Sequence, residues 1–367
     1  MEKELDKKER LMSLDALRGF DMLFIMGLAT FVVAVCNLFP SCGFMQWLSS
    51  QMKHVDWNGL THHDTIFPLF LFVAGVSFPF SIAKQRASGK SEKQIFFKII
   101  TRGLILVFLG MVYNGFFRLD FANLRYASVL GRIGLAWMFS ALLFMKFKPK
   151  VLAVIGVVIL VGYWLLMWLI PGGPDTYSFD NNLVGMVDRA ILPGKLNHFD
   201  PEGLLSTLPA IVTAMLGMFT GQFIRISSDK ISGNKKVLYM IIAAAALLVI
   251  GLLWNIVFPI NKKLWSSSFV CVVASYSLFM LALFYYFIDV KGYRRWTLFF
   301  RVVGMNSITI YLAQQIINFR QVSRYFISGL AGMCPEAWGR LINETGYIIA
   351  CWLFLYFLYK KNVFLKV

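Results

Sequence analysis

The chain has 367 residues, of which 58% are hydrophobic and 15% are charged. A soluble domain carries about 25% charged residues, so this composition excludes an ordinary water-soluble globular protein. The formal net charge of +17 raises the question of nucleic-acid binding, but the Lys and Arg residues lie in short segments between apolar runs. That distribution is typical of membrane-protein loops, and we expect no nucleic-acid partner.

Apolar runs long enough to cross a bilayer as helices recur along the whole sequence. They predict an all-α, polytopic transmembrane bundle. Segment 1–17 is charged and has no cleavable signal pattern, so we expect a cytoplasmic tail there, one transmembrane domain over 18–359 and a second cytoplasmic tail over 360–367. The ten expected spans lie at about 18–38, 62–83, 99–117, 127–145, 151–170, 204–224, 237–257, 268–288, 302–319 and 341–359.

The distribution of basic residues predicts how the bundle is oriented. Of the 36 Lys and Arg residues, 25 fall on the side that holds both termini and 10 on the opposite side, with Arg132 inside the fourth span. The side richer in Lys and Arg faces the cytoplasm in membrane proteins. We therefore expect both termini in the cytoplasm, and the segment before the second span and the long loop 171–203 on the outer side.

The most informative segment is HVDWNGLTHHDTIFPLFLFVAGVSFPF, residues 54–80. It holds His54, His62 and His63 together with Asp56 and Asp64, at the mouth of an apolar helix. Ionisable groups at such a place are costly and usually functional. A neutral imidazole can take a proton or attack an acyl group, and either carboxylate could orient the ring of His54.

The residues alone are equally compatible with a purely structural role for these histidines. His54 could be a hydrogen-bonded interfacial residue and nothing more. His62 and His63 are adjacent, so on a helix they point about 100° apart and do not readily share one site. Their spacing matches no recognised zinc motif, and we expect no metal.

Three arginines mark the mouths or interior of predicted spans. Arg18 lies three residues after Asp15, so the two can form an ion pair on one helical face. Arg102 stands at the mouth of the third span. Arg132 lies inside the fourth, where it could clamp a phosphate or carboxylate, or pair with a helical carboxylate such as Asp21 or Asp64.

Further polar and small residues lie within predicted spans. Asn306 and Ser307 favour a polar channel, whereas Gln314 and Gln315 favour contacts between helices. Gly217 and Gly221 form a GxxxG pattern, which indicates close helix packing. Taken together, the residues allow an enzyme that handles a polar substrate, a transporter that moves one, or a membrane scaffold whose polar residues only join helices. The absence of a visible internal repeat argues against the transporter.

Six blocks in order resemble the heparan-α-glucosaminide N-acetyltransferase family of animal lysosomes and its bacterial homologues. The resemblance covers about residues 14–359. The blocks are SLDALRGF, HVDWNGLTHHDTIFPLFLFVAGVS, VLGRIG, GLLSTLPAIVTAMLG, NKKLWSSSFV, and DVKG with GMNSITIYL.

The resemblance implies a reaction. Acetyl-CoA binds on the cytosolic side, and its acetyl group passes to the amine of glucosamine or a terminal glucosaminide on the outer side. The family's active-site histidine matches His54, and its Asp before the IFP run matches Asp64. Asp64, or Asp56 on the residue argument above, would hold the ring. The acceptor is expected to contact Trp57 and Asn58 of the same motif and His198 of the outer loop.

The expected co-substrate site combines the resemblance with the positions of basic residues. Asn306 and Ser307 match the family's Asn-Ser and could polarise the thioester carbonyl. Arg18, Arg102 and Arg132 are expected at the CoA site, because basic residues attract its phosphates. Either direct transfer or an acetylated His54 is possible, and direct transfer is preferred because it needs no stable acyl-imidazole.

The sequence also departs from the animal pattern. Ala29 and Thr30 stand where the animal enzyme has Asn-Tyr-Gly, Asp56 replaces a small polar residue, and His62 and His63 replace apolar ones. The resemblance implies a multi-pass protein of the bacterial inner membrane, in contact with its lipids, with the active-site loop facing the periplasm. A homodimer is compatible with the family and with the small-residue helix faces. The alternative function is a membrane transporter of a sugar or amino sugar.

Overall fold

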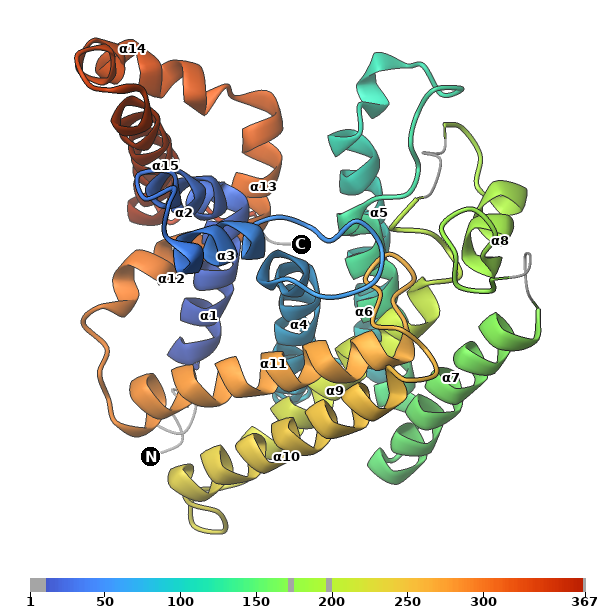
Figure 1. Ribbon diagram of the computed structural model, residues 1–367. Helices are drawn as coiled ribbons and strands as arrows, with labels where there is room; N and C mark the ends of the chain where they lie inside the picture. The colour runs from blue at the N-terminus through green and yellow to red at the C-terminus, as the bar shows by residue number, and fades with distance from the viewer. Residues whose placement is uncertain (1–10, 171–174, 196–199, 366–367) are drawn as a thin grey trace. The chain divides into compact units, whose positions relative to one another are not determined.

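The computed structural model describes residues 11–170, 175–195 and 200–365, and every regular element in these ranges is a helix (Figure 1). Nine of the described helices are long and apolar enough to cross a membrane. The prediction of an all-α transmembrane bundle is therefore confirmed.

The nine long helices agree with nine of the ten expected spans. The first combines α1, Met12–Leu23, with a π-helical turn, Phe24–Leu28, and α2, Ala29–Cys36. The others are α4 His62–Ala87, α5 Glu92–Tyr113, α6 Val129–Lys146, α7 Pro149–Leu169, α9 Thr207–Ile224, α10 Gly233–Trp254, α11 Ser267–Tyr285 with a π-helical end at Tyr286–Val290, and α15 Glu336–Lys360.

The structure differs from the prediction at 302–319. Here α12, Thr297–Met305, ends at Asn306, and α13, Ser307–Ile316, begins directly after it. Asn306 has φ −120° and ψ 24°, and its amide donates to the carbonyl of Val302. An Asn side chain that bonds to the backbone competes with helix continuation, which accounts for the break.

The remaining short helices join the long ones. They are α3 Gly43–Gln51, a 3-10 turn at Phe116–Arg118, α8 Leu183–Ile191 and α14 Phe319–Gly332.

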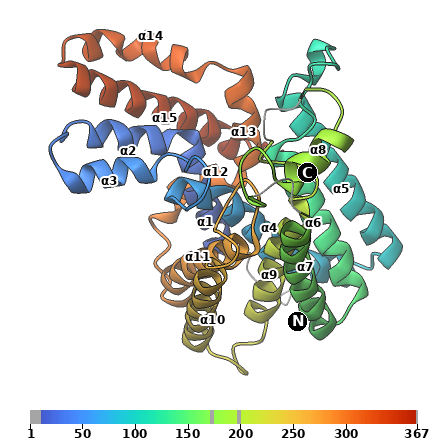
Figure 2. The same cartoon turned by 45° about the vertical axis from the view of Figure 1, so that its right-hand side comes forward.

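The chain forms two compact units. The first unit comprises Met1–Lys53, Gly233–Leu238 and Phe279–Lys366, and the second comprises His54–Ser232 and Tyr239–Leu278. In the first unit α1 packs on α12 with almost no side chain between them, because a Cβ at Gly19 would lie 1.8 Å from the carbonyl oxygen of Phe300. In the same unit, α2 and α3 form one helical pair beside α14 and α15 (Figure 2).

The second unit is built around the contact between α4 and α9. A Cβ at Gly217 would lie 2.1 Å from the carbonyl oxygen of Phe72, and one at Gly221 would lie 2.2 Å from that of Val76. On the α4 side, Gly75 meets the carbonyl of Ala214 in the same way. The close packing predicted from the GxxxG pattern is confirmed, and it fixes α4, the helix that follows the histidine motif.

Replacing Gly217 by Ala should separate α4 from α9, because the added methyl group meets backbone atoms that cannot move aside. We expect a loss of about 1–3 kcal/mol in unfolding free energy, the usual cost of overpacking, measured by thermal unfolding of the purified protein in detergent. Gly162→Ala is the matched control, since a Cβ at Gly162 meets nothing within 4 Å. Equal melting temperatures for the two variants would contradict the proposed packing constraint.

Candidate functional site

The start of α4 determines where the first carboxylate of the site lies. Thr61 is the N-cap of this helix and forms a capping box with Asp64, the third residue of the first turn. The Oδ2 atom of Asp64 accepts from the backbone N–H of Thr61 at 3.2 Å and from its hydroxyl at 2.9 Å. One oxygen of the carboxylate is thereby used to begin the helix, and the other is free to bind a second group.

That second group is the imidazole of His54. Its Nδ1 lies 2.7 Å from Oδ1 of Asp64, and the side chain of Asp64 is 1% exposed whereas that of His54 is 53% exposed. An ionised carboxylate only accepts hydrogen bonds, so we assign the ring proton to Nδ1. Nε2 then carries a lone pair, as a general base requires.

Lys262 completes the cluster, and sequence reasoning did not single it out. Its Nζ lies 3.3 Å from Oδ1 of Asp64 and 3.1 Å from Nδ1 of His54. Burial lowers the pKa of Lys262, and the negative charge of Asp64 partly opposes that shift. The available signal was the pair of lysines in the NKKLW block, which lies just before α11.

The neighbouring histidines diverge, as their adjacency predicts. The rings of His54 and His63 are 4.5 Å apart between centroids, while Nε2 of His62 lies 3.0 Å from the hydroxyl of Tyr276. Within the described part of the chain, no group of three or more His, Cys, Asp or Glu residues is arranged to hold a metal ion.

Two other loops, which contain Tyr177 and Asn261, form hydrogen bonds with the histidine motif. The indole N–H of Trp57 donates to the carbonyl of Tyr177 at 2.7 Å, and the amide of Asn261 donates to Oδ1 of Asn58 at 3.1 Å. Asp56 has an exposed side chain, and its backbone oxygen accepts from Nζ of Lys263 at 2.7 Å. Asp64 is therefore the carboxylate that contacts His54. Asp56 instead contacts Lys263 through its backbone oxygen.

Arg132 lies in the same unit and is 2% exposed. Its Nη2 donates to the carbonyl of Gly203 at 3.1 Å and to the hydroxyl of Ser206, and its guanidinium lies over the ring of Trp265 at 5.0 Å. Its Nε and Nη1 have no hydrogen-bond partner among the described residues. These two buried donors are therefore left unsatisfied by the part of the chain that the structure describes.

An ion-pair cluster orders the loop that leads to α9. Arg125 donates to both oxygens of Asp200, at 2.7 and 2.6 Å, and also to Glu202. The hydrogen bond to Asp200 raises the pKa of Arg125. Nearby, the buried Oδ1 of Asp188 accepts from the backbone N–H of Leu204 at 2.7 Å, and burial raises the pKa of Asp188 to about 6.

The other predicted site residues are placed as follows. Arg18 forms the expected ion pair with Asp15 at 3.6 Å in the first unit. Arg102, in the second unit, lies over the ring of Trp137 at 4.4 Å. Asn306 and Ser307 are buried at the helix break in the first unit. His198 lies outside the described residues.

Asp188 provides a test of this loop structure through pH. Because its pKa in the folded protein is about 6 and the ordinary value is 3.8, the fold favours the protonated carboxyl. The contribution of protonated Asp188 to the free energy of unfolding is fully present below about pH 4 and is lost as the pH rises through 6. Asp188→Asn keeps an oxygen for the N–H of Leu204 and cannot ionise. Its stability relative to the natural protein should increase by about 1–3 kcal/mol between pH 4 and 7.

The measurement is chemical unfolding in detergent at several pH values. Asp120→Asn is the control, because Asp120 is exposed. A constant difference between Asp188→Asn and the natural protein across this pH range would show that Asp188 is ionised without penalty in the fold.

Comparison with known proteins shows which sequences this chain resembles. A family model described as a domain of unknown function (DUF5009) matches residues 10–119, which include His54 and Asp64. The chain is 27% identical over 388 residues to the heparan-alpha-glucosaminide N-acetyltransferase of Mus musculus, covering 86% of this chain and 56% of the relative. It is 28% identical over 377 residues to the protein of the same name from Homo sapiens, with the same coverage.

The chain therefore spans just over half the length of the curated relatives that it matches, and the match extends over most of its own length. These proteins carry the same family name that the six ordered blocks predict. The chain is thus similar in sequence to the heparan-alpha-glucosaminide N-acetyltransferases over most of its own length, which confirms the resemblance carried by the six blocks.

Proposed function

We propose that this chain is a transmembrane N-acetyltransferase that transfers the acetyl group of acetyl-CoA to the amine of glucosamine or a terminal glucosaminide. The observation that carries the proposal is the His54–Asp64 hydrogen bond, in which a half-exposed imidazole is held by a buried carboxylate. This is the arrangement of an oriented general base. The relatives' name supplies the reaction class.

In direct transfer, the acceptor reaches the exposed Nε2 of His54 as its ammonium form and gives up a proton there. The amine nitrogen then attacks the carbonyl carbon of the thioester, so that a C–N bond forms and the C–S bond breaks. The thiolate of CoA leaves and takes up the surplus proton of the acylated nitrogen, which gives the neutral amide and the free thiol, and the imidazolium of His54 then releases its proton to solvent. Asp64 keeps Nε2 directed outward and stabilises the ring when it becomes positive.

Lys262 supports this chemistry as a positioning residue. Its ammonium group contacts both Asp64 and His54, so it helps to hold the carboxylate that orients the ring. We propose that these contacts keep Asp64 and His54 in the geometry that presents Nε2 to the acceptor.

The remaining roles are extensions of the same proposal. Asn306 and Ser307 would polarise the thioester carbonyl, and Arg18, Arg102 and Arg132 would hold the phosphates of CoA. Trp57 and Asn58 would contact the acceptor. The charge bias of the loops supports an outer, periplasmic position for the His54 loop and an inner-membrane location for the protein.

The first test compares the natural protein with His54→Ala, using purified protein in detergent with acetyl-CoA and glucosamine. Loss of a general base should lower the rate by about 10²–10⁴-fold. Free thiol and acetylated sugar are followed together, the latter by mass spectrometry. His62→Gln is the matched control, because His62 contacts Tyr276 instead of Asp64, and its rate should stay within a few-fold of the natural one.

Equal amounts of thiol and acetylglucosamine, both lost in His54→Ala, are the expected result. Turnover by His54→Ala at the natural rate would remove His54 from the mechanism. Absence of both turnover and acetyl-CoA binding in folded protein would overturn the acetyltransferase proposal altogether.

Lys262→Met tests this positioning role. Without the ammonium group Asp64 loses one of the contacts that hold its Oδ1 in place, so kcat should fall by about tenfold while KM changes little. Lys263→Met is the matched control, because Lys263 binds the backbone of Asp56 and lies near the rings of Trp57 and Phe179. A kcat of Lys262→Met equal to that of Lys263→Met would show that Lys262 does not position the base.

A further inference from the structure

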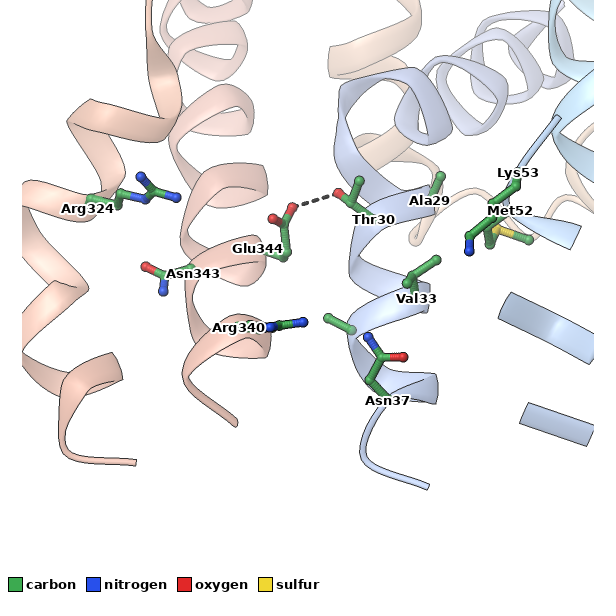
Figure 3. Close-up of a pocket in the computed structure, with 11 residues that line it drawn as sticks. Ala29, Thr30, Val33, Asn37, Met52, Lys53, Arg324, Arg340, Asn343 and Glu344 are labelled. Atoms are coloured by element: carbon green, nitrogen blue, oxygen red, sulfur yellow. Dashed lines mark hydrogen bonds between the residues drawn. The ribbon is translucent and has the colours of Figure 1, made fainter. Parts of the chain in front are cut away.

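A separate cavity lies in the first unit, among α2, the end of α3, α14 and α15. Its volume is about 410 Å³, which is within the usual range of small-molecule sites. Figure 3 shows Glu344, Arg340 and Asn343 on one side and Thr30, Val33 and Asn37 of α2 on the other. None of its lining residues belongs to the unit that contains His54.

The charges around this cavity are unequal. Three cationic side chains line it, from Lys53, Arg324 and Arg340, against one carboxylate, from Glu344. Glu344 is already engaged, because it accepts from the hydroxyl of Thr30 at 2.6 Å and from the guanidinium of Arg320. The carboxylate therefore serves to hold α15 against α2, and among the lining side chains the cations outnumber the carboxylate three to one.

The two arginines remain available to a ligand. Arg324 forms no ion pair with any residue that the structure describes. Arg340 contacts Glu336 one turn away on α15, and both side chains are mostly exposed. Exposed pairs of this kind contribute at most about 1 kcal/mol, so a bound anion can compete for Arg340.

The remaining wall indicates that the ligand is larger than a simple ion. α2 supplies apolar groups, from Ala29, Val33 and Ala34, and two amides also line the cavity, Asn37 at the end of α2 and Asn343 on α15. The Oδ1 atom of Asn343 is buried without a hydrogen-bond partner among the described residues. An unsatisfied acceptor next to cations is suited to a molecule that carries both hydroxyl and acid groups.

We propose that this cavity is a binding site for a small hydroxylated organic acid of about monosaccharide size, with its carboxylate held by Arg324, Arg340 and Lys53. The hydroxyl groups of the ligand bind the amides of Asn37 and Asn343, and its carbon skeleton lies on the apolar groups of α2. The site is independent of the acetyl-transfer chemistry at His54, since the two share no residue.

The test uses the full chain in detergent with glucuronate as the probe, at constant ionic strength, by isothermal titration calorimetry. Glucose has the same ring without the carboxylate, and acetate has the carboxylate without the ring. Glucuronate should bind saturably, and both of the other compounds should bind at least tenfold more weakly. Arg324→Gln combined with Arg340→Gln should weaken glucuronate binding at least tenfold.

Arg189→Gln is the matched control, because Arg189 is exposed on α8 in the other unit, and it should bind glucuronate as the natural protein does. Melting curves of the unliganded variants establish that they are folded. The proposal is overturned if glucuronate does not bind saturably, if glucose or acetate binds equally well, or if the folded double variant keeps its affinity.

Discussion

The candidate site depends on the two hydrogen-bonding directions of one buried carboxylate. One oxygen of Asp64 caps the start of α4, and the other holds the imidazole of His54. A carboxylate in a capping box has little freedom, because it lies in the first turn and accepts from the N–H of the N-cap residue, here Thr61. The start of α4 therefore determines the orientation of the His54 ring. The position of α4 is in turn fixed by its close contact with α9.

The loops on this side of the second unit are ordered by polar contacts that compensate for their burial. Arg125 binds two carboxylates, Arg132 binds the segment at the start of α9, and Lys262 binds Asp64. Removing such charges from water is costly unless each finds a partner. These paired loops surround His54, whose side chain is still half exposed. Partial exposure is what a residue that contacts a substrate requires.

Local patterns in the sequence predicted much of this structure. Apolar runs located nine of the spans, the GxxxG pattern located the α4–α9 contact, and the spacing of Asp15 and Arg18 predicted their ion pair. The cluster of His54 with Asp56 and Asp64 was identified because these residues lie close together in sequence, before and at the start of one apolar helix. All of these features follow from residues that are near in sequence or that repeat with the period of a helix.

The features that were not predicted arise from contacts between distant segments. Lys262 is 208 residues from His54 in sequence, and nothing local distinguishes it from Lys263, which turns toward Trp57 instead. Asp56 and Asp64 were equal candidates until the capping geometry of α4 decided between them. The cavity beside α2 likewise combines cations from three separate segments, so no single motif could reveal it.

The break at Asn306 has an electrostatic consequence of its own. The carboxyl end of α12 and the amino end of α13 meet at this residue, which is 1% exposed. Aligned peptide dipoles give the end of one helix a partial negative charge and the start of the next a partial positive charge. A partial negative and a partial positive charge therefore lie within one turn of each other in the buried interior. A continuous helix would have no such charges at this position, because its backbone N–H and C=O groups would be paired.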